Sequence, residues 1–204
     1  MLFRSLLLKA LPPEVTTSTP YFENLRQIKT APLAGIHLWF DRHFDCPPAL
    51  ALLDRETEWI FNKSQNWSLP QEQGTYLSMV ISASHRFAKT PKEEIVRTVL
   101  EDVRSAIPGA REAQVVRSQV IRWPKATLVP QAGLEALRPT QRSPIANLYV
   151  AGEWTDTGWP STMEAAARSG FLAAEALLED AGTPHSLLAQ DLPVSGLARL
   201  LLKR

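Results

Sequence analysis

The sequence predicts a mixed fold of helices and strands, of the α+β or α/β class. Residues 34–41 alternate apolar and polar side chains, which is typical of a strand with one buried face. Residues 90–107 and 161–182 instead repeat apolar side chains at three- and four-residue spacings, which predicts two amphipathic helices. The chain has 204 residues, 45% of them hydrophobic, and this is enough for one large core or two small ones.

The first part of the chain predicts short helices followed by a sheet. Residues 1–11 carry a helix pattern that stops at Pro12-Pro13, because proline interrupts a helix. The threonine-rich stretch 14–20 is typical of a turn, and residues 21–28 predict a second helical piece. We expect an antiparallel or mixed sheet from the strand patterns that follow at 34–41, 58–62 and 76–82.

A longer helix is predicted over 90–107. Thr90 is its expected cap, with Pro91 at the first helical position and Glu93 as the partner in a capping box. The apolar residues at helical spacing, which predict the buried stripe, are Ile95, Val99, Val103 and Ile107. A further strand is predicted over 113–122.

The last third of the chain contains a strand–glycine–helix unit. Leu148–Ala151 is a short apolar run that predicts a buried strand, and it ends at Gly152. Ser161 precedes Glu164 by three positions, which is the capping-box signature of a helix start, and Gly182 marks the helix end. The helix face that this spacing predicts to be buried consists of Met163, Ala167, Gly170, Ala174 and Leu177.

The start of this last helix predicts a site for a group with negative charge. The unpaired N–H groups and the dipole of a helix start stabilise an anion by about 0.3–1 kcal/mol at an exposed end. Glu153, which follows the strand, is placed to accept hydrogen bonds from ligand hydroxyls. A flavin meets both conditions, because its ribityl chain carries hydroxyls and its reduced ring carries negative charge. The alternative is an ordinary strand–loop–helix unit without a ligand.

The string Leu-Tyr-Val-Ala-Gly-Glu-Trp, continued by Gly-Trp-Pro-Ser-Thr-Met-Glu-Ala-Ala and Ser-Gly, resembles a known flavin-binding segment. It is similar to the C-terminal segment of the amine oxidase and phytoene desaturase superfamily, and within it to the hydroxysqualene dehydroxylase family. The resemblance implies FAD as the cofactor, with Gly152 and Glu153 at the ribityl and pyrophosphate region. It also implies that the pyrimidine edge of the ring meets the segment Trp159, Pro160, Ser161, Thr162 and Met163, the last three through their backbone N–H groups.

The same resemblance implies a division of the chain into parts. Residues 1–122 correspond to a portion of the substrate-binding domain, and residues 123–182 correspond to the C-terminal part of the FAD-binding domain. Residues 183–204 form a tail whose end is apolar with terminal cations, which suits contact with an anionic membrane surface. Packing against another subunit, or no fixed structure, is the alternative for this tail.

Aromatic residues on the predicted strands suggest one wall of a substrate cavity. A flat apolar wall suits a long hydrocarbon, and the aromatic residues in question are Trp39, Trp59, Phe61 and Tyr76. The alternative is that they fill an ordinary core. By the resemblance, Trp123 and Lys125 in the string Trp-Pro-Lys-Ala-Thr pass near the flavin and the cavity. For these two the alternative is the surface of an edge strand.

Composition limits the other classes of function. The net charge is +1 without a basic block, which argues against nucleic acid as a partner. The single cysteine, Cys46, lacks neighbouring bases and is expected to be structural. The four histidines lack the spacing of metal ligands, so we expect no metal site and a structural or surface role for each of them. No apolar run approaches the roughly 18 residues of a membrane span, so we expect a cytoplasmic protein with at most peripheral membrane contact.

No Gly-x-Gly pair occurs in the sequence, so the fingerprint that would hold the ADP half of FAD is missing. We therefore expect a fragment or one part of a split enzyme, inactive alone and completed by an N-terminal FAD-binding half from the same gene or a separate chain. The predicted activity is reductive removal of the hydroxyl of hydroxysqualene to give squalene, and no catalytic side chain can be named. The alternatives are a carotenoid or phytoene desaturase, an amine oxidase, or a non-catalytic assembly module.

Overall fold

The computed structural model describes residues 2–193 and 196 and divides the chain into two compact units. The first unit comprises residues 1–5 and 29–130, and the second comprises residues 6–28 and 131–204. The second long segment of the second unit begins after Pro130, and residues 6–28 group with it. The assignment of the two parts to substrate and FAD binding stays a prediction.

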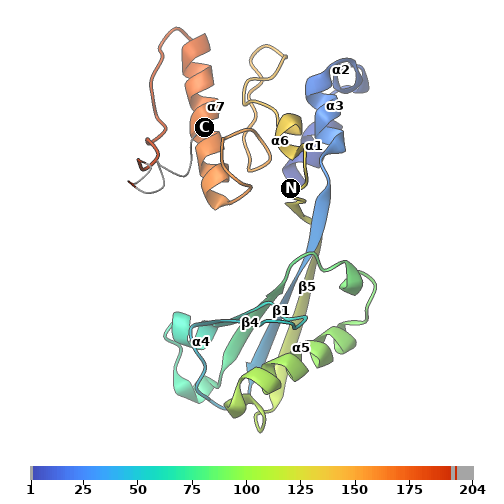
Figure 1. Ribbon diagram of the computed structural model, residues 1–204, viewed down its shortest axis with the longest axis vertical. Helices are drawn as coiled ribbons and strands as arrows, with labels where there is room; N and C mark the ends of the chain where they lie inside the picture. The colour runs from blue at the N-terminus through green and yellow to red at the C-terminus, as the bar shows by residue number, and fades with distance from the viewer. Residues whose placement is uncertain (1, 194–195, 197–204) are drawn as a thin grey trace. The chain divides into compact units, whose positions relative to one another are not determined.

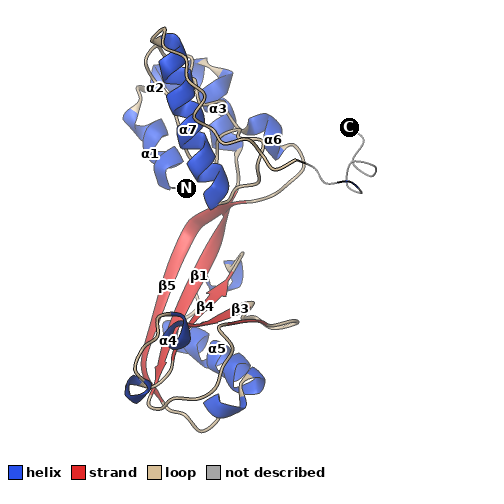
Figure 2. Ribbon diagram, turned by 90° about the vertical axis from the view of Figure 1, so that its left-hand side faces the viewer, coloured by secondary structure: helices blue, strands red, loops and turns tan. Residues whose placement is uncertain are grey.

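The first unit contains a five-stranded sheet in which every neighbouring pair of strands is antiparallel. This confirms the antiparallel form of the predicted sheet. Its strands are β1 (Thr30–Phe40), β2 (Ala49–Ala51), β3 (Trp59–Asn62), β4 (Tyr76–Ile81) and β5 (Val115–Leu128), in the order β2-β3-β4-β1-β5. The two long strands β1 and β5 run side by side (Figure 2). Because β1 lies between β4 and β5, its side chains have neighbours on both sides.

One face of this sheet forms the core of the unit. Helix α5 (Lys92–Ala106) lies along that face (Figure 1), and its residues Ile95, Val99 and Val103 are fully buried as the spacing predicts. They pack against inward-facing strand residues, which include Ile36, Leu38, Phe40, Ile60, Leu77 and Met79. The predicted cap was wrong: Pro91 occupies the N-cap position without a side-chain bond. The hydroxyl of Thr90 instead donates to the carbonyl of Arg86, 3.0 Å away.

Strand β5 is longer than predicted and continues through Pro124 to Leu128. A proline has no N–H to donate to a ladder, so it is tolerated where a strand lies at the edge of a sheet. Since β5 is the last strand in the sheet order, its outer side needs no partner. The smaller helical elements of this unit are α4 (Lys63–Asn66) and three 3-10 turns at Gln71–Gln73, His85–Phe87 and Pro108–Ala110.

The second unit is mainly helical. Helix α1 (Leu2–Ala10) runs into it from the first unit, and α2 (Pro13–Ser18), α3 (Pro20–Gln27), α6 (Leu134–Leu137) and α7 (Met163–Asp180) follow. The turn predicted over 14–20 was wrong, because Pro13 stands at the first position of α2, where a proline has no N–H to lose. The strand predicted over Leu148–Ala151 is reduced to one bridge, Arg142 to Tyr149, since no other described strand lies beside it.

Helix α7 differs from its prediction at its start and in its buried face. Its cap is Thr162 instead of Ser161: Thr162 has extended backbone angles, and its hydroxyl accepts the N–H of Ala165 at 3.3 Å. The buried residues of α7 are Ala165, Arg168 and Ser169. The predicted face is turned outward, with Met163 91% and Leu177 49% exposed. The predicted end holds, because Gly182 adopts φ +76° and donates to the carbonyl of Glu179.

The segment after α7 is described only as far as residue 193, with residue 196 in addition. Glu175 of α7 holds the beginning of this segment, since its carboxylate accepts the N–H groups of Leu187 and Leu188 at 2.6 and 2.8 Å. The cationic end that predicts membrane contact lies outside the described residues. Within the part of the chain that the structure describes, no helix has the length and apolar character needed to cross a bilayer.

Candidate functional site

The loop between Val150 and Thr162, which carries the predicted cofactor residues, is organised by Arg138. This side chain is buried and donates to three backbone carbonyls of the loop: Nε to Thr155 at 2.9 Å, Nη1 to Trp159 at 2.8 Å and Nη2 to Glu153 at 3.2 Å. Its Nη1 also contacts the carboxylate of Glu135 at 2.8 Å. Arg138 thus fixes the loop from its centre, and the sequence analysis missed it because nothing in the sequence pairs an arginine with distant carbonyls.

Gly152 allows the chain to turn tightly at the beginning of this loop. Its φ is +144°, and a Cβ at this position would come within 2.4 Å of the indole nitrogen of Trp154. Trp154 is buried, so that ring has no room to move away. The N–H of Gly152 donates to the hydroxyl of Ser169 on α7 at 2.7 Å, which joins the loop to the helix. The backbone conformation and the contact with Trp154 therefore require a glycine at position 152, independently of its predicted place near the ribityl region.

The start of α7 offers backbone donors. Among the hydrogen bonds of residues 2–193 and 196, none uses the N–H groups of Ser161, Thr162 or Met163 as donors. These residues are exposed or half-buried, so the three groups are accessible from outside the helix. Unpaired N–H groups at a helix start favour an anionic partner. The structure thus leaves open the corner that the sequence predicts to face the pyrimidine edge of a flavin, and the residues present fit that group.

The other predicted cofactor residues have mixed surroundings. Glu153 is half-buried, and its backbone carbonyl accepts from Arg138. Pro160 is exposed beside the helix start. Trp159 is engaged on two sides: its indole N–H donates to Asp191 at 3.3 Å, and the guanidinium of Arg168 lies 5.5 Å from its ring centroid. The cofactor role of these residues stays a prediction.

The predicted aromatic wall lies on the sheet face opposite the core. Trp39 on β1 pairs with Tyr76 on β4, and their rings stack at 4.5 Å between centroids with 8° between planes. Trp59 and Phe61 on β3 stack at 5.9 Å and 8°, and their β4 partners Val80 and Ser78 share this face with Tyr76. The prediction that these four aromatic residues share one face is confirmed, and we call this surface the aromatic face. Its role toward a substrate stays a prediction.

Cations border the aromatic face. The guanidinium of Arg117 on β5 lies 4.6 Å from the ring centroid of Trp39. The ammonium of Lys63 lies 5.3 Å from the ring of Trp67 and 5.6 Å from that of Phe61. These distances are typical of cation–π contacts, which stabilise by about 0.5–1 kcal/mol at exposed sites. The face is therefore apolar in its rings and positive at its border.

The structure places Trp123 next to the aromatic face and leaves Lys125 at the surface. Trp123 is 41% exposed and lies against Gly35, where a Cβ would approach the indole to 3.1 Å. It also lines a cavity of about 190 Å³ together with Leu33 and Phe87. Lys125, two positions further along β5, is exposed. Trp123 thus extends the aromatic face along β1, whereas no described contact of Lys125 distinguishes it from an ordinary surface lysine.

A histidine and a tyrosine form a hydrogen-bonded pair on the aromatic face. Nδ1 of His37 lies 2.8 Å from the hydroxyl of Tyr76, and the His37 ring stacks against Trp39 at 6.1 Å. Burial, and next the charge of Lys63, hold the pKa of His37 below its usual value. Burial raises the pKa of Tyr76. His37 is therefore mainly neutral at pH 7, whereas the sequence predicts only a structural or surface role for it.

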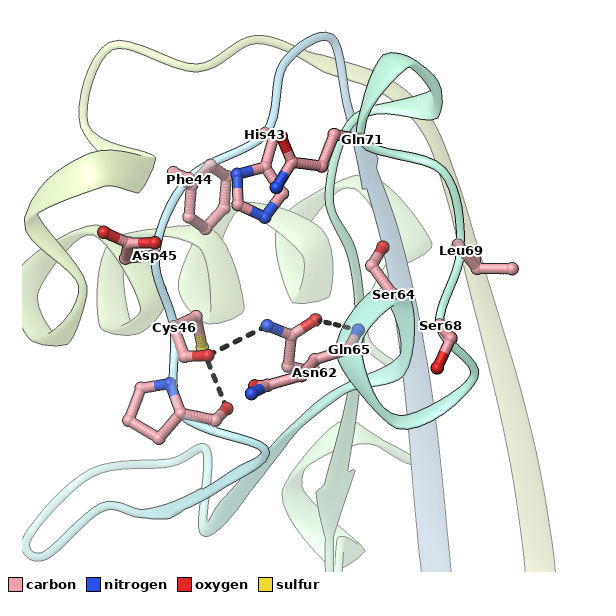
Figure 3. Close-up of a pocket in the computed structure, with 11 residues that line it drawn as sticks. His43, Phe44, Asp45, Cys46, Asn62, Ser64, Gln65, Ser68, Leu69 and Gln71 are labelled. Carbon is pink, nitrogen blue, oxygen red and sulfur yellow. Dashed lines mark hydrogen bonds between the residues drawn. The ribbon is translucent and has the colours of Figure 1, made fainter.

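A larger and more polar cavity of about 670 Å³ lies between the segment 43–47 and the stretch 62–71 (Figure 3). Its central groups bond to each other, since the side-chain amide of Asn62 donates to the carbonyl of Cys46 at 2.9 Å and accepts the N–H of Gln65 at 3.1 Å. Burial raises the pKa of the Cys46 thiol to about 11. The described residues contain no cluster of three or more His, Cys, Asp or Glu side chains that would hold a metal ion.

Solved structures share this fold. A putative protoporphyrinogen oxidase from Exiguobacterium sp. 255-15 superimposes with a TM-score of 0.59 at 17% identity, over 83% of this chain and 39% of that one. An oxidoreductase from Methanosarcina mazei gives a TM-score of 0.52 at 19% identity, over 84% of this chain and 39% of that one. At these identities the likeness shows the fold alone, a mixed arrangement of helices and strands that this chain shares with 39% of each of these longer chains.

Curated relatives match most of the chain. A hydroxysqualene dehydroxylase of Sinorhizobium fredii is 32% identical over 74% of this chain and 33% of its own length. A 15-cis-phytoene desaturase of Solanum lycopersicum is 25% identical over 85% of this chain and 31% of its own length. The chain thus spans about a third of the length of these relatives. The model of the flavin-containing amine oxidoreductases matches residues 5–178, so the chain belongs to this family of flavin-dependent oxidoreductases.

Proposed function

We propose that this chain is the C-terminal portion of an FAD-dependent oxidoreductase that removes the hydroxyl of hydroxysqualene reductively to give squalene. The observation that carries the proposal is the aromatic face, an apolar surface on which Trp39 stacks on Tyr76 and Trp59 stacks on Phe61. Such a surface suits a long hydrocarbon chain. The match to a hydroxysqualene dehydroxylase at 32% identity supports the choice of this substrate among isoprenoids.

The proposed cofactor residues are those at the start of α7. The N–H groups of Ser161, Thr162 and Met163 would hydrogen-bond the anionic edge of the reduced ring, and the positive end of the helix would stabilise its charge. Arg138 would hold the loop that presents them. The cofactor, when bound, would supply the hydride that replaces the hydroxyl, and the hydroxyl would take up a proton and leave as water. Because no Gly-x-Gly pair occurs in this sequence, the ADP half of FAD would be held by an N-terminal half outside the present residues.

A second candidate is a carotenoid or phytoene desaturase, since the relative from Solanum lycopersicum is a 15-cis-phytoene desaturase. An amine oxidase is less well supported by the charges. A protonated amine on the aromatic face would meet Lys63 and Arg117, and like charges repel. A neutral hydrocarbon chain meets no such penalty.

The test compares the chain alone with the chain co-expressed with an N-terminal FAD-binding half, taken from the same gene or from a neighbouring gene. The visible absorption spectrum reports bound flavin, and gas chromatography after anaerobic incubation with a reductant and hydroxysqualene reports squalene. We expect both signals only in the co-expressed preparation. Conversion of phytoene, or of an amine, in place of hydroxysqualene would support the alternatives. A preparation that contains neither flavin nor activity would refute the oxidoreductase proposal in favour of a non-catalytic module.

A further inference from the structure

A polar row crosses the middle of the aromatic face. His37 stands on β1, and the register places it opposite Ser78 on β4 and Gln119 on β5. Two positions along β1 in one direction lies Trp39, stacked on Tyr76. Two positions in the other direction lies Gly35, which Trp123 covers. This row of hydrogen-bonding groups thus lies between aromatic rings on both sides.

The orientation of the His37 ring is fixed. One ring nitrogen, Nδ1, is committed to the Tyr76 hydroxyl at 2.8 Å, and Tyr76 is itself held by stacking on Trp39. The His37 ring also lies 6.1 Å from the Trp39 ring with 30° between planes. A side chain held by one hydrogen bond and two ring contacts presents its second nitrogen in a defined direction.

That second nitrogen, Nε2, is open. The hydrogen bonds among the described residues give it no partner. It lies 3.8 Å from the position that a Cβ of Gly35 would occupy, on the side of the strand where the Trp123 indole covers the glycine. His37 is half-buried, and along β1 it stands between Trp39 on one side and the Gly35–Trp123 contact on the other.

The charges near His37 indicate which chemical group its free nitrogen would bind. Lys63 and burial keep the imidazole neutral at pH 7, so Nε2 is a donor or an acceptor according to the tautomer. A hydroxyl group satisfies either tautomer, because it both donates and accepts. An ammonium group would be repelled by Lys63 and Arg117, which border the face. A neutral hydroxyl on an apolar chain fits both the nitrogen and the rings.

We propose that His37, positioned by Tyr76, is the group of the aromatic face that binds the hydroxyl of a long hydrocarbon alcohol. The rings of Trp39 and Trp123 on either side contact the hydrocarbon, and Nε2 hydrogen-bonds the hydroxyl oxygen. The inference rests on the proposed function and adds the residue that distinguishes the alcohol from the hydrocarbon of the same skeleton.

The experiment measures binding of hydroxysqualene and squalene to the chain co-expressed with an N-terminal FAD-binding half, which is the preparation that the proposed function requires. Both ligands are delivered from methyl-β-cyclodextrin, and the fluorescence of the tryptophans on the face gives the two dissociation constants. The variants are His37→Phe, which keeps a ring but removes both nitrogens, and Tyr76→Phe, which removes only the positioning hydroxyl. His185→Phe is the matched control, because His185 is exposed and belongs to the other compact unit.

We expect the wild-type chain to bind hydroxysqualene about tenfold more tightly than squalene, which is the effect of one hydrogen bond to a ligand hydroxyl. His37→Phe should abolish this preference and leave squalene binding unchanged, Tyr76→Phe should reduce it, and His185→Phe should keep it. Unchanged squalene binding also shows that the variant is folded. A preference that persists in His37→Phe, or squalene binding without preference in the wild type, overturns the inference alone. Binding of neither ligand to the wild type overturns the proposed function as well.

Discussion

Replacing Arg138 by methionine is the sharpest test of how the candidate cofactor loop is held. The change keeps an unbranched apolar stem but removes the guanidinium donors to the carbonyls of Glu153, Thr155 and Trp159. Hydrogen bonds from a charged group contribute about 1.5–3 kcal/mol each, and a buried acceptor that loses its donor adds a desolvation cost. Since such contributions are not additive, we expect the loop to lose about 3–5 kcal/mol of stability in total.

Arg142→Met is the matched control, because Arg142 lies on the surface with its ion pairs to Glu179 and Asp180. An exposed pair contributes about 0–1 kcal/mol, so this variant should change little. The assay is hydrogen exchange of peptides that cover residues 150–162, with a peptide of β1 in the other unit as internal reference. Arg138→Met should lower the protection of the loop by at least about a hundredfold. A decrease below about tenfold, similar to that of Arg142→Met, would show that the loop is held by other contacts.

Three further predictions concern single positions. Gly152→Ala should lower stability by about 2 kcal/mol or more in thermal denaturation, because its Cβ meets Trp154 and its φ is positive, whereas Gly170→Ala, with open space around it, should raise stability by about 0.5–1 kcal/mol. An increase in stability for both Gly152→Ala and Gly170→Ala would contradict the loop geometry at Gly152. Cys46, whose pKa is raised to about 11, should react with Ellman's reagent at pH 8 only after unfolding, and rapid labelling of the native chain would disprove its burial. Because the pKa of His37 is lowered, the folded chain binds this proton less tightly than the unfolded chain. The free energy of unfolding is therefore highest above the unfolded pKa of about 6.5 and falls as the pH decreases toward the folded pKa. Urea denaturation of His37→Phe should therefore show a flatter loss of stability between about pH 7 and pH 5, and an unchanged profile would contradict the assigned shift.

Local patterns determined much of the fold. The alternation in β1 and the three- and four-residue spacing in α5 set which of their side chains are buried, because a strand and an isolated amphipathic helix each have one apolar face. The same alternation put Trp39 on the opposite face from Ile36 and Leu38, so the aromatic face was predictable before any coordinates. The resemblance could predict a cofactor segment because the residues of that segment are contiguous in the sequence.

Contacts between distant residues were decided only by the tertiary structure. Arg138 precedes the carbonyls that it binds by 15 to 21 positions, and His37 meets Tyr76 through strand pairing. Neither contact has a signal in local spacing. The buried face of helix α7 was also not predictable from local spacing. Its small residues allow close packing on more than one face, and the packing of the rest of the unit against Ala165 and Ser169 determines which face is buried. Periodicity defines an apolar stripe, but the element that covers it is set by the rest of the fold.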